Sequence, residues 1–322
     1  MDRPYPIRNI LTGGRLDRAH QRRSDAAWLR ARRRDGTSRI LPVWRSQPLI
    51  QRGDPPRAGS VSPSWAYRLV GDGATWVFLG LLDDVPWFTL DLSHLERPPA
   101  TLLKGGRFVS LRDVGPLLES SEASIVTFAC GISNWHRANR FCSTCGHGTR
   151  VSEGGHQRVC TQSGCGRSHF PRTDPAVIVL VHDGADRCLL VHQPEFRPKV
   201  YSTLAGFTEP GESLEETVVR EVQEETGVVV SAPRYHSSQP WPFPSSMMVG
   251  FMARALRTEL DLDPREIADA RWFSRSELRA AVAADEIRLP SPVSIAYRLV
   301  SDWLEGGDGP RREPRVSRSA SA

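Results

Sequence analysis

The chain has 322 residues, and 42 Lys and Arg against 37 Asp and Glu give it a formal charge of +5 at pH 7. This length predicts about two domains, and 39% apolar and 25% charged residues exclude a collagen, a coiled coil or a wholly disordered chain. The most conspicuous apolar run, residues 176–181, is much shorter than the roughly 18 residues of a membrane helix, which excludes a membrane span.

The first residues of the chain and its cysteines both indicate the cellular compartment in which the protein is expected. The first ten residues lack the charged start and apolar block of a secretory signal, which predicts a cytoplasmic protein. Because thiols stay reduced in that compartment, the six cysteines are expected to be metal ligands or buried thiols rather than disulfides. Cys130 and Cys188 have apolar neighbours in the sequence and are expected to be buried.

Residues 1–138 are predicted to form a β-rich N-terminal domain. Residues 76–82 and 87–92 are rich in β-forming side chains and flank an Asp-Asp-Val-Pro turn, which is typical of two strands joined by a tight connection. Apolar side chains then recur at steps of three and four over residues 120–139, which predicts a helix with one buried face.

An Arg-rich segment, residues 15–39, carries much of the excess positive charge. We interpret it as the solvated face of a helix that turns Leu16, Trp28 and Leu29 inward, and a nucleic-acid-binding patch is the alternative. The C-terminal residues 305–322 are rich in Ser, Pro, Gly and Arg, with almost no apolar side chain to bury. They are predicted to be a disordered tail.

Residues 139–171 are predicted to form a zinc ribbon. Two close thiol pairs, C-x2-C and C-x4-C, would supply the four tetrahedral ligands that Zn²⁺ prefers, from Cys142, Cys145, Cys160 and Cys165. The second pair is wider than usual, and four unrelated free thiols are the alternative. A closed site of four protein ligands leaves no position for a reacting water, so one structural zinc per chain is expected.

Residues 172–304 read as strand, turn, strand, loop, long helix, further strands and two short helices. Helical spacing places Glu221 and Glu225 one turn apart on one face, with Glu224 beside them. Like charges at this spacing repel, so a cation is expected among them. Oxygen ligands select Mg²⁺ or Mn²⁺, and such ions bridge phosphate oxygens. A solvated acidic helix face is the alternative.

The residues before and after this acidic helix favour a binding site over a solvated helix face. Gly206 and Gly211 permit a tight loop before the helix, and Gly227 ends it. Ser213 followed by Glu216 is typical of a capping box. Arg220 is expected to point away from the Glu221 and Glu225 face and to fix the loop by pairing with Glu212.

Past the helix, residues 238–246 read Ser-Gln-Pro-Trp-Pro-Phe-Pro-Ser-Ser. Proline has no amide hydrogen for a sheet ladder, so this segment is excluded from a central strand and predicted to be a stiff loop. A polar and aromatic loop of this kind can form the wall of a site for a flat base, and a proline-rich surface turn is the alternative.

The stretch from Gly206 to Val228 matches the Nudix box, G-x5-E-x7-R-E-U-x-E-E-x-G-U with U apolar, at every position. Seven fixed identities at about 1 in 20 each make a chance match on the order of 10⁻⁹ per window. The chain therefore resembles the Nudix hydrolases. The resemblance implies an α+β fold, with an α/β/α sandwich around a mixed sheet in residues 172–304 that follows the β-rich domain and the zinc ribbon.

The proline-rich loop and the order of the parts also resemble the NADH pyrophosphatases of the NudC type. This resemblance implies a homodimeric hydrolase that cleaves NADH, and NAD, to NMN(H) and AMP by metal-activated water. It implies that Glu221, Glu225 and Glu266 are the carboxylate ligands of two or three Mg²⁺ or Mn²⁺ ions, with the backbone oxygen of Ala205. Glu224 would be a further ligand or the base, and Arg220 with Glu212 would support the catalytic loop.

The same resemblance implies a set of substrate contacts. Phe170 and Phe207 look like the aromatic pair that sandwiches adenine, although the family commonly has Tyr at the first position. Arg112 is expected to reach a substrate phosphate from the first domain. The remaining contacts would come from Gln239, Pro240, Trp241, Pro242, Phe243, Pro244, Ser245, Ser246 and Ala296.

Two other functions fit the same residues. One is removal of an NAD cap from RNA, which uses the same chemistry and differs only in the substrate. The other is a catalytically inactive zinc-ribbon protein that binds nucleic acid, which the complete set of box carboxylates disfavours. No interaction with a membrane is expected.

Overall fold

The computed structural model describes residues 9–70 and 74–306, which form two compact units. The N-terminal unit comprises residues 10–174 and 240–247, and the C-terminal unit comprises Asn9 with residues 175–239 and 248–306. The segment expected to be a separate zinc ribbon is part of the N-terminal unit. The predicted tail, apart from its first two residues, lies outside the described residues.

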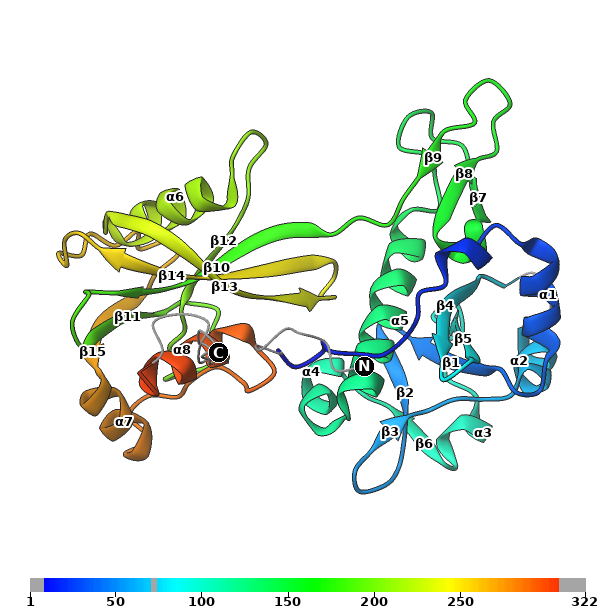
Figure 1. Ribbon diagram of the computed structural model, residues 1–322, viewed down its shortest axis with the longest axis horizontal. Coiled ribbons are helices and arrows are strands. Elements are labelled where there is room, and N and C mark those ends of the chain that lie inside the picture. The colour runs from blue at the N-terminus through cyan, green and yellow to red at the C-terminus, as the bar shows by residue number, and fades with distance from the viewer. Residues whose placement is uncertain (1–8, 71–73, 307–322) are drawn as a thin grey trace, which may run out of the picture. The chain divides into compact units, whose positions relative to one another are not determined.

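A six-stranded sheet in the order β3-β2-β1-β5-β4, with β6 beside β2, organises the N-terminal unit (Figure 1). Its strands are β1 (Arg39–Trp44), β2 (Gln47–Gln51), β3 (Arg57–Ala58), β4 (Trp76–Leu82), β5 (Val85–Asp91) and β6 (Gly106–Phe108). Its helices are η1 (His20–Arg22), α1 (Ala26–Arg34), α2 (Pro63–Val70), α3 (Ala100–Leu103), α4 (Leu111–Val114), η2 (Gly115–Leu117) and α5 (Ser120–Ala138). β1 runs parallel to β5 and antiparallel to β2, so the sheet is mixed.

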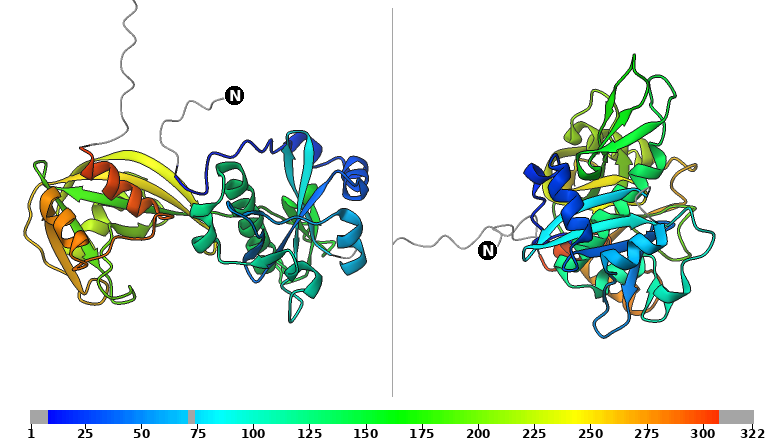
Figure 2. Two further views of the ribbon diagram at one scale, coloured as in Figure 1. Left: turned by 90° about the horizontal axis from the view of Figure 1, so that it is seen from below. Right: turned by 90° about the vertical axis from the view of Figure 1, so that its right-hand side faces the viewer.

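The predicted pair of strands and the predicted long helix are confirmed. β4 and β5 meet at Asp83 and Asp84, which both have positive φ, the backbone conformation of the tightest hairpin turns. α5 contacts β1, β2, β4 and β5 and contributes its apolar face to this unit (Figure 2). Phe78 and Phe88 fill the core on the sheet, each 1% exposed.

The Arg-rich segment contains a shorter helix than its charge pattern suggested. Only Ala26–Arg34 is α-helical, and Asp25 caps its start by accepting a hydrogen bond from the Trp28 amide. Leu16 and Leu29 are buried, as expected, and Trp28 is partly buried against Phe78. The arginines of the segment range from exposed to partly buried, so the solvated face is less complete than predicted.

A small three-stranded sheet follows α5 in the N-terminal unit. It consists of β7 (Thr149–Ser152), β8 (Gln157–Cys160) and β9 (Ser168–His169), with η3 (Glu153–Gly155) between the first two strands. Both strand pairs are antiparallel. These short strands bring the four predicted zinc ligands to one end of the small sheet.

The C-terminal unit is built on the second six-stranded sheet, in the order β13-β14-β10-β11-β15, with β12 paired to β10. Its strands are β10 (Asp174–His182), β11 (Arg187–His192), β12 (Leu204–Phe207), β13 (Val230–Trp241), β14 (Ser246–Ala255) and β15 (Asp269–Ser274). Its helices are α6 (Leu214–Thr226), α7 (Arg275–Ala283) and α8 (Ile295–Leu304). Figure 1 shows α6 on one face and α7 and α8 on the other, which confirms the predicted α+β sandwich.

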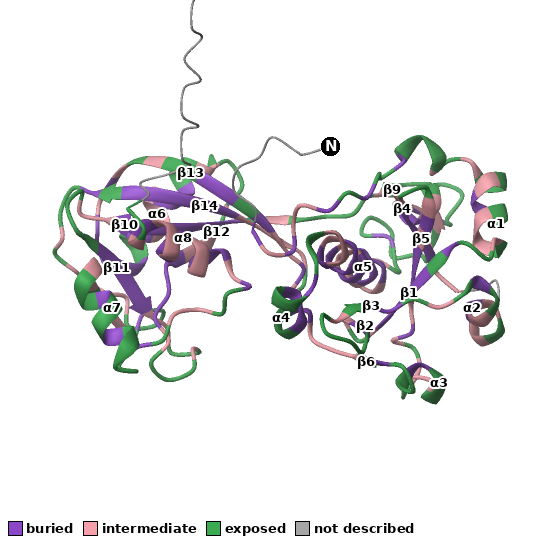
Figure 3. Cartoon of the chain, turned by 60° about the horizontal axis from the view of Figure 1, so that its bottom comes forward, coloured by how far each residue is buried: buried purple, intermediate pink, exposed green. Residues whose placement is uncertain are grey.

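Burial follows from this layering. β10 is apolar from Ala176 to Val181 and buried over the whole run, because helices cover both faces of the sheet. β11 and β14 are also buried over most of their length (Figure 3). The face toward α7 and α8 packs Leu180 and Leu190 against Leu299 and Trp303. None of the helices in residues 9–70 and 74–306 combines the length and apolarity that crossing a bilayer requires.

Candidate active site and zinc centre

The acidic helix α6 starts and ends where local chemistry requires. The Ser213 hydroxyl accepts a hydrogen bond from the Glu216 amide at 3.2 Å, and the Glu216 carboxylate accepts one from the Ser213 amide at 2.7 Å. Gly227 ends the helix in the left-handed region, at φ 71°, where a side chain would be strained. Both ends were predicted, and together they fix the rotation at which α6 presents its carboxylates.

β12 lies directly beside this helix, and Gly206 is the closest point of approach. A Cβ atom built on Gly206 would lie 1.9 Å from the Glu221 carboxyl carbon and 2.1 and 2.3 Å from its two oxygens. The carboxylate therefore occupies the space that any side chain at position 206 would fill. This contact explains the glycine better than backbone freedom does, because no left-handed φ is recorded there.

Arg220 is bound to three carboxylates at once. Its guanidinium donates to Glu212 at 2.5 and 2.9 Å, to Glu221 at 2.9 Å and to Glu224 at 3.0 Å. It also donates to the backbone oxygen of Phe207 at 3.0 Å. These bonds hold the pKa of the Glu212 carboxyl near 2 and raise that of Arg220.

The predicted pairing with Glu212 is confirmed, but the expectation that Arg220 points away from Glu221 was wrong. The guanidinium presents five N–H donors in a fork, enough to span the loop carboxylate and two helix carboxylates together. Arg220 thus links the loop to the acidic face of α6 and partly neutralises that face.

Glu225 is the buried member of the acidic cluster. It is 3% exposed, and its Oε2 atom has no hydrogen-bond partner among the described residues. Burial, and after it the nearby charges of Glu221 and Glu266, raise the pKa of this carboxyl to about 8. A buried oxygen without a partner beside two more carboxylates fits a hard divalent cation, which would supply the missing positive charge.

The other predicted metal and proton-transfer groups lie on α6, on β12 and in the turn before β15. Glu221 is largely buried, with a pKa raised first by desolvation and then by Glu224 and Glu266. The Glu266 side chain is exposed in the turn before β15, and its charge acts on both Glu221 and Glu225. Ala205 precedes Gly206 in β12 and pairs with Ile178 of β10. The charge of Glu266 therefore acts on both helix carboxylates, and a shared metal site of the three stays a prediction.

Replacing Gly206 by alanine is expected to separate activity from folding. The new methyl group must displace the Glu221 carboxylate, a flexible side-chain end, so the fold should persist while the carboxylate moves. Turnover should fall by about tenfold or more, because about 1 Å of misplacement can cost that much. Steady-state kinetics and thermal melting measure the two effects. Gly105→Ala is the control, since its Cβ would meet nothing within 4 Å.

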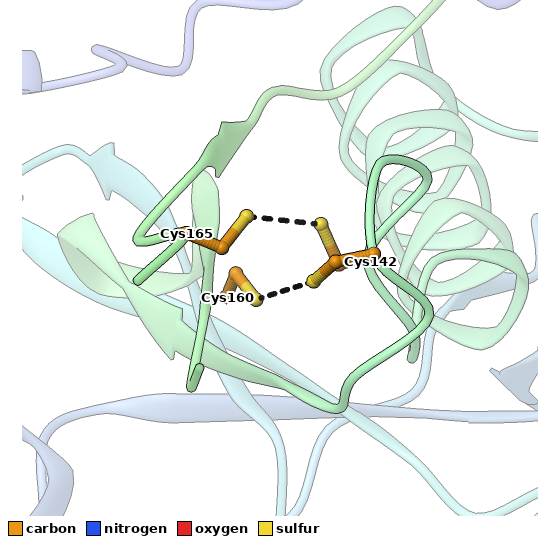
Figure 4. Close-up of side chains that lie close together, drawn as sticks. Cys142, Cys160 and Cys165 are labelled. Carbon is orange, nitrogen blue, oxygen red and sulfur yellow. Dashed lines mark hydrogen bonds between the residues drawn. The ribbon is translucent and has the colours of Figure 1, made fainter. Parts of the chain in front are cut away.

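The second centre is the group of four cysteines in the N-terminal unit (Figure 4). Their sulfur atoms all lie within 4.8 Å of one another. Cys142 and Cys165 are 3.8 Å apart at sulfur, and Cys145 and Cys160 are 3.4 Å apart. Tetrahedral zinc with sulfur ligands at about 2.3 Å requires sulfur separations of about 3.8 Å. The donor set therefore fits zinc, and the wider second pair has not prevented convergence.

The two remaining cysteines are buried, as predicted. Cys130 lies in α5 and Cys188 in β11, and burial raises the pKa of each thiol to about 12. They pack as small apolar side chains and are separate from the zinc cluster.

The proline-rich segment is a hairpin end rather than a free loop. β13 continues through Pro240 to Trp241, β14 begins at Ser246, and β13 is the edge strand of its sheet. The exclusion from a central strand is therefore confirmed, but the loop is shorter than expected. Proline is tolerated there because one side of an edge strand needs no ladder donor.

Two residues that the sequence did not single out hold this hairpin end. The Asn134 side chain in α5 donates to the backbone oxygens of Pro242 at 3.1 Å and Pro244 at 3.2 Å. Asp174 accepts from the Ser245 hydroxyl at 2.8 Å. A cavity of about 280 Å³ lies between α5 and the hairpin end, so the segment lines a hollow, and its contact with a flat base stays a prediction.

The residues that are predicted to contact substrate differ in their exposure and in their neighbours. Arg112 is exposed, with its guanidinium 4.5 Å from the Phe243 ring and 5.4 Å from the Trp241 ring. Phe170 and Phe207 are 65% and 60% exposed, as stacking surfaces must be, and they belong to different units. Their pairing around a base stays a prediction.

Gln239 and Ala296 are placed for support. The Gln239 side chain is 0% exposed, donating to the Val293 oxygen at 2.7 Å and accepting from the Ile295 amide at 2.9 Å. Ala296 is 1% exposed in the core. Gln239 therefore holds the start of α8, and Ala296 packs in the core. A direct contact of either residue with substrate stays a prediction.

Models of three protein families match the chain consecutively. They are described as an NADH pyrophosphatase-like rudimentary NUDIX domain at residues 37–135, an NADH pyrophosphatase zinc ribbon domain at residues 137–170, and a NUDIX domain at residues 172–291. Their order is the order expected from the sequence. The first match also identifies the β-rich N-terminal domain as a second, rudimentary copy of the Nudix fold, which the sequence alone did not indicate.

Curated relatives match the same region. The human NAD-capped RNA hydrolase NUDT12 is 40% identical over 197 residues, which is 58% of this chain and 43% of the relative. The NAD-capped RNA hydrolase NudC of Mycobacterium tuberculosis (strain ATCC 25177 / H37Ra) is 42% identical over 204 residues, covering 61% of this chain and 64% of the relative. The chain thus spans about two fifths to two thirds of the length of these relatives.

Among solved structures, a NUDIX hydrolase from Nitrosomonas europaea aligns with 52% of this chain and 90% of its own, at 21% identity and a TM-score of 0.41. The assignment rests on the family models and on the intact box, whose carboxylates, arginine and glycines make the contacts described above. The chain therefore belongs to the Nudix family, with a rudimentary Nudix domain and a zinc ribbon preceding its Nudix domain.

Proposed function

We propose that this protein hydrolyses the diphosphate of NADH and NAD to NMN(H) and AMP. The observation that carries the proposal is the buried Glu225 carboxylate, whose Oε2 has no hydrogen-bond partner among the described residues and whose pKa is raised by burial and by the charges of Glu221 and Glu266. Such a cluster is costly unless a cation and its phosphate ligands complete it. The zinc-ribbon and NADH pyrophosphatase-like matches support a dinucleotide substrate.

The residues that would hold Mg²⁺ or Mn²⁺ are Glu221, Glu225 and Glu266, with the backbone oxygen of Ala205. Such ions, when bound, lower the pKa of a water and neutralise charge on phosphate oxygens. Arg220 orients Glu221 and Glu224 through its hydrogen bonds, and Gly206 leaves the space in which the Glu221 carboxylate lies. These contacts define the geometry before substrate arrives.

Proton transfer is assigned to a carboxylate of the box, Glu224 or Glu225. Water attacks one phosphorus in line, its proton passes to the carboxylate, and the bond from that phosphorus to the bridging oxygen breaks. Oε2 of Glu225 has no hydrogen-bond partner among the described residues, whereas Glu224 accepts a hydrogen bond from Arg220 at 3.0 Å, and this difference supports Glu225 as the acceptor.

Removal of an NAD cap from RNA is the second candidate, and the names of the curated relatives favour it. The bond cleaved is the same, so the two candidates differ only in what the adenosine carries. Product analysis decides between them, with NADH, NAD, ADP-ribose, FAD and NAD-capped RNA incubated with the protein and Mn²⁺. Release of AMP from NADH supports the first, and faster, salt-sensitive cleavage of capped RNA supports the second. Absence of any cleavage would favour an inactive binding protein.

Phe207→Ala is expected to raise KM for NADH by about tenfold, and to change kcat less, because stacking on a base serves ground and transition states alike. Steady-state kinetics with NADH measure both constants. Phe141→Ala is the control, since Phe141 is 65% exposed against 60% for Phe207 and is assigned no contact with substrate. A fall confined to kcat would contradict a stacking role.

Homodimer formation and a cytoplasmic location belong to the same proposal. Light scattering on the purified full-length chain tests the first, with twice the 35.9 kDa chain mass as the expected value. A monomer that is fully active would contradict the proposed dimer.

A further inference from the structure

A second hollow lies in the N-terminal unit and shares no residue with the box or the hairpin end. It has a volume of about 560 Å³ and lies at the end of α5 beside β5 and β8. Its charged and titratable lining consists of Asp91, His94, His136, Arg137, Arg140 and Arg158. Three arginines against one aspartate leave an excess of two positive charges.

Arg158 is the buried cation of this hollow. It is 7% exposed, and its three hydrogen bonds go to the Thr149 hydroxyl at 2.7 Å, the Thr149 backbone oxygen at 2.9 Å and His136 Nδ1 at 2.9 Å. All three acceptors are neutral. Since a guanidinium has five N–H donors, one on each terminal nitrogen has no assigned acceptor among the described residues.

His136 cannot provide the missing negative charge, because it is itself a neutral donor and acceptor. Its Nδ1 accepts from Arg158, so the proton lies on Nε2, which donates to the Gly155 oxygen at 2.8 Å. Burial lowers the pKa of this imidazole to about 4. His136 therefore fixes the direction of the Arg158 fork and does not change its charge near pH 7.

The other two arginines differ in their partners. Arg137 pairs with Asp91 at 3.1 Å and also donates to Ser46 and Ser93. The exposed Arg140 side chain has no carboxylate partner among the described residues, and its charge adds to the factors that lower the pKa of Arg158. Asp91 is therefore already paired, and the charges of Arg140 and Arg158 remain uncompensated.

We propose that this hollow binds a phosphate monoester through Arg140 and Arg158. A monoester carries close to two negative charges at pH 7, which matches the excess, and its oxygens accept hydrogen bonds from guanidinium forks. The volume exceeds that of a phosphate group, leaving room for the esterified part. The ligand chemistry is shared by a free mononucleotide and the 5′-monophosphate end of an RNA. The proposal does not rest on hydrolase activity.

Titration calorimetry of the full-length, zinc-loaded protein without added Mg²⁺ or Mn²⁺ tests the proposal. Under this condition the carboxylates of the box repel phosphate, so they do not obscure the second site. The ligands are inorganic phosphate, AMP, and a trinucleotide with either a 5′-phosphate or a 5′-hydroxyl, at about 0.15 M salt to screen weak surface binding.

Arg140→Gln is the test variant, because its exposed side chain can be replaced without disturbing the bonds of Arg158. It should weaken binding of AMP and the phosphorylated trinucleotide by about tenfold, the effect of losing a charged hydrogen-bonding partner. Arg107→Gln, which removes an exposed arginine of the same unit outside the hollow, should bind like the parent.

The ligand series separates the possible sources. Tighter binding of AMP identifies a free mononucleotide, and tighter binding of the phosphorylated trinucleotide identifies an RNA end. Equal affinity for the two trinucleotides would overturn the monoester assignment. Unchanged affinity in Arg140→Gln, or an equal loss in Arg107→Gln, would overturn the site itself.

Discussion

Glu225→Gln is expected to lower turnover on NADH by about 10²-fold or more while the protein stays folded. The substitution keeps the shape of the side chain and removes the charge that a divalent cation needs from the buried member of the cluster. Initial rates with Mg²⁺ and Mn²⁺, together with circular dichroism, measure the two effects. Glu215→Gln, an exposed position of the same helix, should retain parental turnover. Parental turnover in Glu225→Gln would refute the metal assignment.

The same variant has a predicted effect on stability in protein prepared without Mg²⁺ or Mn²⁺. The pKa of the Glu225 carboxyl is about 8 in the folded state against 4.5 for the ordinary group. The folded state therefore holds this proton more tightly than the unfolded state. The free energy of unfolding should consequently fall as pH rises from about 5 to about 8, by a few kcal/mol.

Glu225→Gln should remove this part of the pH dependence and be more stable than the parent at pH 8. Urea unfolding at pH 5 and pH 8 measures the difference between the two proteins. Adding Mg²⁺ at pH 8 should stabilise the parent more than the variant, because the variant lacks the buried carboxylate of the proposed ligand set. Identical pH profiles for the two proteins would contradict the buried, unpaired carboxylate.

Cys145→Ser is expected to abolish the stoichiometric binding of zinc and to unfold the small sheet β7-β8-β9. Structural zinc contributes roughly 10–16 kcal/mol of apparent binding free energy in small zinc modules, and this segment has little apolar core of its own. The Cys145 side chain is exposed, so the loss arises from the missing thiolate rather than from packing. Metal analysis and hydrogen exchange of residues 149–169 measure the outcome.

Cys188→Ala is the control for this experiment. Cys188 is fully buried in the other unit, so its replacement leaves a small cavity but should leave the zinc content at one per chain. A Cys145→Ser protein that keeps its zinc and its slow exchange would show that the four sulfur atoms converge without holding a metal.

The elements that the sequence predicted well are those specified by neighbouring residues. The capping box of α6, its end at Gly227 and the periodicity of α5 depend on side chains within about one or two helical turns. The Nudix box is likewise continuous in sequence, so its carboxylates could be identified before any contact was known. The cysteine pairs predicted their own cluster because each pair closes a short turn.

Contacts between distant segments were decided only by the tertiary structure. Asn134 holds backbone oxygens 108 and 110 residues further along the chain, which no local pattern signals. The burial that raises the pKa of Glu225 and the Arg220 side chain's reach to Glu221 depend on packing and on side-chain conformation. Arg158 reads as an ordinary basic residue until the fold buries it beside neutral hydrogen-bond acceptors.

The amino-acid sequence by itself determined the family, the four-cysteine cluster and the acidic helix, because each depends on residues that are close together in the chain. The tertiary structure decided which carboxylate is desolvated, which side chains hold the hairpin end, and where positive charge is left uncompensated. The burial of a side chain and the net charge around it depend on all the neighbours that folding brings together. A sequence pattern does not identify those neighbours.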